Sequence, residues 1–107
     1  MGTFTYNSAL HITINDTDLA HLEAVIGVKF RAQESFYFDW TGTANDATNR
    51  TTVWLNPHIS VSYRYLSTAR PVLNPDRVTK MLLEADTPAG LHLVLPPAPQ
   101  PDLITAA

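Results

Sequence analysis

The chain has 107 residues, of which 45% are apolar and 16% are charged, with a formal net charge of −3 at pH 7 and no cysteine. That length is typical of one domain, which can bury a core without disulfide or metal cross-links. The missing cysteines exclude disulfides, thiolate metal sites and cysteine nucleophiles. Neither an apolar run of the ~18 residues that a membrane span requires nor a secretory signal pattern is present, so we expect a cytoplasmic protein without membrane contact.

Hydrophobic periodicity predicts six strands and two helices. Alternation of apolar and polar residues marks the strands. It is clearest where Phe36, Phe38 and Trp40 share one face of a strand and Tyr37 and Asp39 share the other. In chain order, the predicted elements are strands 3–6 and 10–15, helix 16–32, strands 35–40, 51–55 and 60–65, helix 75–84 and strand 91–95.

Each predicted helix begins with its own start signal. Asp16 and Asp18 place negative charge in the first turn of one helix, and Asn74 followed by Pro75 is a favoured start for the other. Apolar residues then recur at i, i+3, i+4 and i+7 spacing in both. The resulting order, ββαβββαβ, predicts an α+β domain over residues 1–95, with a largely antiparallel sheet and both helices on one face.

Two segments fall outside this pattern. Residues 41–49 are small and polar, and are predicted to form a long surface loop. Residues 96–107 begin with four prolines in six positions and are predicted to be a proline-rich C-terminal extension. A P-x-x-P ligand and a simple extended terminus are both compatible with that composition, and the second is favoured.

No spacing in the sequence indicates catalysis. The glycine-rich nucleotide fingerprints and the G-x-S-x-G nucleophile motif are absent. The histidines, including His11 and His92 on predicted strands, are not spaced as metal ligands, and His21 lies three residues from Asp18, which predicts a pair on the helix surface. We therefore expect no catalytic, cofactor or metal residue. A histidine-dependent or metal-assisted hydrolase using His21 and His58 is the weakest alternative.

Aromatic and basic side chains supply a candidate interaction surface. Tyr37 and Trp54 lie on the strand faces opposite to the neighbouring residues that are predicted to be buried, so we expect them to be exposed. Residues 50–95 carry a net charge of +2, against −4 for residues 1–49. The candidate residues are Tyr37, Trp54, Arg50, Arg64, Arg70, Arg77 and Lys80.

The leading hypothesis is a non-enzymatic binding or assembly protein that contacts a protein partner or a second copy through a strand edge. The alternative is a DNA-associated accessory protein that uses the arginines and aromatic stacking.

Several segments spread over the predicted domain form a distinctive set: Leu19-Ala20-His21-Leu22, Glu34-Ser35-Phe36, Trp54-Leu55-Asn56-Pro57-His58-Ile59, Leu73-Asn74 and Ala89-Gly90-Leu91-His92. On these segments the chain resembles a family of small uncharacterised actinobacterial proteins that are often labelled ATP-dependent DNA ligase; Asn56 and Ala89 depart from the family's usual His and Gly. A ligase needs a nucleophilic lysine in a K-x-D-G setting, and neither Lys29 nor Lys80 is followed by Asp-Gly. The resemblance thus implies a family grouping and no ligase activity.

Overall fold

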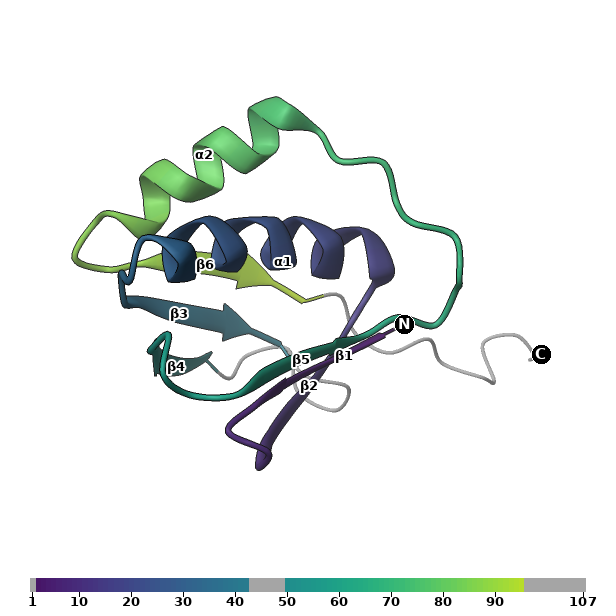
Figure 1. Ribbon diagram of the computed structural model, residues 1–107, viewed down its shortest axis with the longest axis horizontal. Coiled ribbons are helices and arrows are strands. Elements are labelled where there is room, and N and C mark those ends of the chain that lie inside the picture. Colours follow the sequence, from purple (N-terminus) through teal and green to yellow (C-terminus); the bar gives the residue numbers. More distant parts are fainter. Residues whose placement is uncertain (1, 43–49, 96–107) are drawn as a thin grey trace.

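The computed structural model describes residues 2–42 and 50–95 (Figure 1). Its elements are β1 (Gly2–Tyr6), β2 (Leu10–Ile14), α1 (Asp16–Arg31), β3 (Phe36–Thr41), β4 (Arg50–Leu55), β5 (Val61–Arg64), α2 (Pro75–Ala85) and β6 (Leu91–Val94). The predicted α+β order is confirmed, and each boundary lies within one residue of its prediction. Most of the predicted loop and the whole proline-rich extension lie outside the described residues.

The strands form two three-stranded sheets instead of one continuous sheet. The first has the order β2-β1-β5 and is antiparallel, whereas the second has the order β4-β3-β6, with β6 parallel to β3. The chain passes from the second sheet to the first after β4, at Asn56-Pro57, where proline removes a backbone donor. The Tyr6 hydroxyl links the sheets there: it donates to the Trp54 carbonyl at 2.9 Å and accepts from the Asn56 N–H at 3.1 Å.

The core lies between the inner faces of the two sheets and α1. Phe4 of the first sheet meets Phe38 of the second edge to face, with ring centroids 6.1 Å apart. The α1 side chains Leu22 and Ile26 are fully buried against this layer. In Figure 1 both helices lie on the same side of the strands, α1 next to them and α2 further out, against α1 and β6. No helix among the described residues is both long and apolar enough to cross a membrane.

His21 connects α1 to the start of α2. Its side chain is only 1% exposed. Nε2 accepts a hydrogen bond from the Asn74 N–H at 2.9 Å, so the proton of the neutral ring lies on Nδ1. Nδ1 donates it to the Thr17 carbonyl at 2.7 Å. The prediction of a surface pair between His21 and Asp18 is therefore wrong: the ring turns inward, and Asp18 pairs with Arg77 of α2 instead, at 2.7 Å.

Candidate interaction surface

The two sheets carry different side chains on their outer faces. The outward residues of the first sheet are hydroxylic, imidazole or charged: Thr3, Thr5, His11, Thr13, Ser62 and Arg64. Those of the second sheet are Tyr37, Asp39, Thr41, Arg50, Thr52, Trp54, His92 and Val94. Three of them, Tyr37, Trp54 and Val94, are exposed large aromatic or apolar side chains. We call this second set the aromatic face. Exposed apolar area is therefore concentrated on one of the two outer surfaces.

Tyr37 and Trp54 form an exposed aromatic pair toward one end of the aromatic face. They are cross-strand partners on β3 and β4, with ring centroids 4.7 Å apart and ring planes at 65°. Tyr37 is 45% exposed, Trp54 is 50% exposed and Val94 on β6 is 70% exposed. The predicted exposure of the two aromatic residues is confirmed. β4 is the last strand of its sheet, so its second edge has no partner among the described strands.

A shallow groove of about 510 Å³ lies beside this aromatic pair, bounded on its far side by the end of α2 and residues 85–88. Lys29 holds the two sides in place. It is 6% exposed, and its Nζ donates to Asp86, which follows α2, and to Glu34 at 3.0 Å. The hydrogen bond to Asp86 raises the pKa of Lys29, so the ammonium stays charged. Lys29 lies in the last turn of α1, where the helix dipole favours a cation, and nothing in the sequence points to these partners.

A second polar pair lies on the same face. The Asp39 carboxylate is 7% exposed and contacts Nδ1 of His92, its register partner on β6. Glu84 of α2 accepts the backbone N–H of His92 at 3.0 Å, which occupies part of the second edge of β6. Such a carboxylate fixes the orientation of an imidazole ring. The sequence gives no sign of this pair, because Asp39 has no local partner.

The histidines and acids of the described residues include no group of three or more that could hold a metal ion. His58 is exposed in the turn after β4, where its N–H donates to the Asn56 side chain. His21 has both ring nitrogens engaged inside the domain. His21 is thus buried between α1 and the start of α2, whereas His58 lies in an exposed turn.

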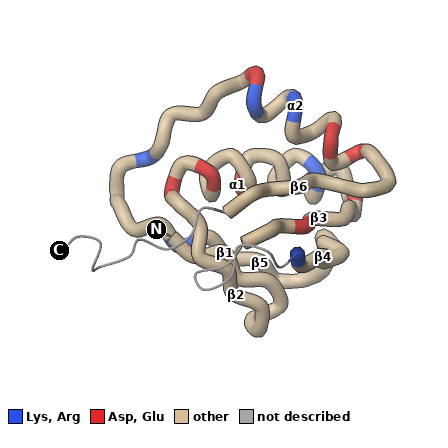
Figure 2. The backbone as a smooth tube through the Cα atoms, turned by 180° about the vertical axis from the view of Figure 1, so that it is seen from behind, with Lys and Arg blue, Asp and Glu red and all other residues tan. Residues whose placement is uncertain are grey.

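The five basic candidate residues are spread over β4, β5, the segment before α2 and α2 itself (Figure 2). Arg50 begins β4 and belongs to the aromatic face, whereas Arg64 lies on the outer face of the first sheet. The other three lie in the segment before α2 or on α2 itself: Arg70, Arg77 and Lys80. The structure thus brings Tyr37, Trp54 and Arg50 onto one surface and places the remaining candidates elsewhere.

Comparison with known proteins gives a family but no activity. The chain matches no curated protein and no solved structure. A family model described as a domain of unknown function, DUF7882, matches residues 1–96 and so covers almost all of the sequence. This agrees with the resemblance to an uncharacterised family. The chain belongs to the DUF7882 family.

Proposed function

We propose that this chain is a small binding or assembly protein without catalytic activity of its own, and that its aromatic face contacts another protein surface, in the simplest case a second copy. The exposed Tyr37–Trp54 pair carries the proposal. Tyrosine and tryptophan concentrate binding energy at interfaces because each buries a large apolar area with few rotatable bonds and retains one polar group. The first sheet, whose outer face lacks such residues, serves as an internal contrast.

The dimensions of the aromatic face bound the strength of such an interaction. Three strands about 4.8 Å apart and six residues of about 3.3 Å each give an area of roughly 300 Å². A stable interface buries about 800 Å² on each partner. The partner must therefore extend beyond the strands, over the groove at residues 85–88 or along the second edge of β4, or else bind weakly.

Sedimentation velocity of the full chain over a wide concentration range tests self-association. The wild type should sediment faster as its concentration rises. Trp54→Ser should weaken association at least about 30-fold, the loss for one interface hot spot of about 2 kcal/mol, because a symmetric dimer loses the side chain from both copies. His11→Ser removes an exposed ring from the other sheet and should change nothing. A wild type that stays monomeric excludes the second copy as the partner, and equal effects of the two variants contradict the choice of face.

The nucleic-acid alternative has less support. Only Arg50 of the five basic candidates shares the aromatic face, Asp39 lies at its centre, and the chain as a whole is acidic. Proteins that bind nucleic acid through phosphates carry a basic surface, and their affinity falls steeply with salt. Titration of labelled single-stranded and duplex DNA at two salt concentrations decides this point: salt-sensitive binding that Trp54→Ser removes would favour the alternative.

A further inference from the structure

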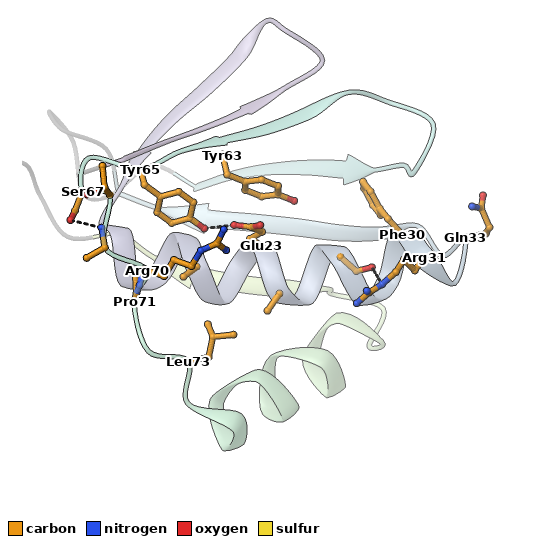
Figure 3. A pocket seen from close by; sticks show the side chains of 15 residues that line it. Glu23, Phe30, Arg31, Gln33, Tyr63, Tyr65, Ser67, Arg70, Pro71 and Leu73 are labelled. Carbon is orange, nitrogen blue, oxygen red and sulfur yellow. Dashed lines mark hydrogen bonds between the residues drawn. The ribbon is translucent and has the colours of Figure 1, made fainter.

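A larger groove, of about 1130 Å³, runs along the exposed side of α1 (Figure 3). Its floor is the α1 surface at Ala20, Ala24 and Gly27. One wall comes from Tyr63 and Tyr65 at the end of β5. The other comes from the segment 66–73 that leads to α2. This groove lies on other elements than the aromatic face and serves no purpose in the function proposed above.

The wall formed by segment 66–73 is held in place at both ends by hydrogen bonds to α1. At its start, the Asp16 carboxylate accepts from the backbone N–H groups of Leu66 at 3.2 Å and Ser67 at 3.0 Å. These two bonds lower the pKa of Asp16 and keep it anionic at neutral pH. At its end, His21 accepts from the Asn74 N–H. The groove is therefore preformed, which reduces the entropy that a ligand must overcome on binding.

Gly27 keeps the floor open. A Cβ atom added at this position meets no other atom within 4 Å, so close packing does not require the glycine. Glycine inside a helix costs about 0.5–1 kcal/mol relative to alanine. Together with Ala20 and Ala24, it leaves a smooth, weakly polar surface along the helix, and the Phe30 ring adds apolar area at one end.

The charged and phenolic groups around the groove favour an anion. Arg31 and Arg70 both line it, and Figure 3 shows Arg70 extending from its segment toward Tyr65. The Glu23 carboxylate is already engaged by the Tyr65 hydroxyl, which donates to it. Both phenols are protonated at neutral pH, and burial raises the pKa of Tyr63 and of Tyr65 further above its usual value near 10. The Tyr65 hydroxyl and the Glu23 carboxylate thus engage each other, and the groove offers a ligand two guanidinium groups and the Tyr63 hydroxyl.

We propose that this groove binds a small amphiphile: an apolar chain or ring system that lies on the α1 floor and carries one carboxylate, which pairs with Arg31 or Arg70. Charge complementarity sets the head group, and the apolar floor sets the body. An extended peptide fits less well. The backbone groups of α1 are used within the helix, so the floor would leave the peptide's own N–H and C=O groups without partners.

Isothermal titration of the full chain tests the proposal with two probes of equal chain length, sodium dodecanoate and dodecyltrimethylammonium chloride, each below its micelle concentration. Dodecanoate should bind with 1:1 stoichiometry and the cation should not. Arg31→Gln combined with Arg70→Gln should weaken dodecanoate binding about tenfold. The matched control, Arg64→Gln with Lys80→Gln, removes the same charge outside both the groove and the aromatic face and should leave the affinity unchanged.

Gly27→Leu separates binding from folding. The new side chain would fill the floor, so dodecanoate binding should be lost. The thermal unfolding midpoint should not fall, because nothing lies near the added Cβ and leucine is a better helix former. No dodecanoate binding by the wild type, equal binding of both amphiphiles, or undiminished binding by a folded Gly27→Leu variant would overturn the proposal.

Discussion

Replacing His21 with phenylalanine should destabilise the domain, because the imidazole links two helices from a buried position. The ring is 1% exposed, donates to the Thr17 carbonyl and accepts from the N–H of Asn74, the residue that caps α2. Phenylalanine preserves the apolar contacts of the ring and removes both nitrogens. The variant thus isolates the two hydrogen bonds from the packing of the side chain.

The expected loss of unfolding free energy depends on which hydrogen bonds the Asn74 N–H and the Thr17 carbonyl keep once the imidazole is gone. A backbone N–H that loses its acceptor costs about 1–3 kcal/mol, and because Asn74 is exposed, water can partly replace the imidazole. The Thr17 carbonyl lies inside α1 and keeps its helical bond, so it adds little. We expect His21→Phe to lower the unfolding free energy by about 1–2 kcal/mol. His21→Ala, which also leaves a cavity, should cost about 2–4 kcal/mol.

Urea unfolding followed by circular dichroism measures these differences. The midpoint of His21→Phe should fall by roughly 1 M with the slope unchanged, since the slope for a domain of this size is about 1–1.5 kcal/mol per molar urea. His11→Phe is the matched control: His11 is exposed on β2 and its hydrogen bond with the Thr5 hydroxyl, at 2.9 Å, is open to water, so the replacement should stay within about 0.5 kcal/mol. A His21→Phe protein as stable as the wild type would refute the role assigned to the ring.

Three further predictions concern glycines, a lysine and two tyrosines. Gly27→Ala should raise the unfolding free energy by about 0.5–1 kcal/mol. Gly90→Ala should lower it, because Gly90 has a φ of +83° and the new Cβ would overlap the Tyr37 carbonyl. Urea unfolding in which both variants shift in the same direction would contradict this. Lys29→Met should lower the unfolding free energy by no more than about 2 kcal/mol, because the Glu34 and Asp86 carboxylates that it releases are 55% and 61% exposed and can be hydrated. A loss of about 4 kcal/mol or more in the same assay would contradict this. Burial raises the pKa of Tyr63 and Tyr65 in the fold, so above about pH 10 the unfolded chain loses these protons first and stability should decline; a thermal midpoint that does not fall there would contradict the burial of the phenols.

The elements and the exposed aromatic pair could be predicted because both are local properties of the sequence. Alternation in β3 places Phe36, Phe38 and Trp40 inside and Tyr37 outside, and the structure agrees. The start of α2 at Asn74 follows from a capping residue before a proline, and that cap accepts two backbone N–H groups as expected. Signals of this kind depend only on neighbours a few residues away.

The division into two sheets could not be predicted, because alternation reports which face of a strand is buried and not which strand lies beside it. The polar contacts were missed for the same reason. Lys29 meets Asp86 across 57 residues, and Asp39 meets His92 across 53. The helix dipole already explains a lysine at position 29, and Asp39 has no partner near it in the sequence. Only the folded chain identifies the partner of each.

Site-specific photo-crosslinking in the host cell identifies what the aromatic face contacts. A photoreactive amino acid at position 54 reports what the aromatic face touches, and the same amino acid at position 11 reports the outer face of the first sheet. We expect a discrete protein adduct from position 54, either a dimer of this chain or an adduct with one defined partner, that Tyr37→Ser reduces, and no such adduct from position 11. Equal adducts from both positions, or only the unmodified monomer from position 54, would contradict it.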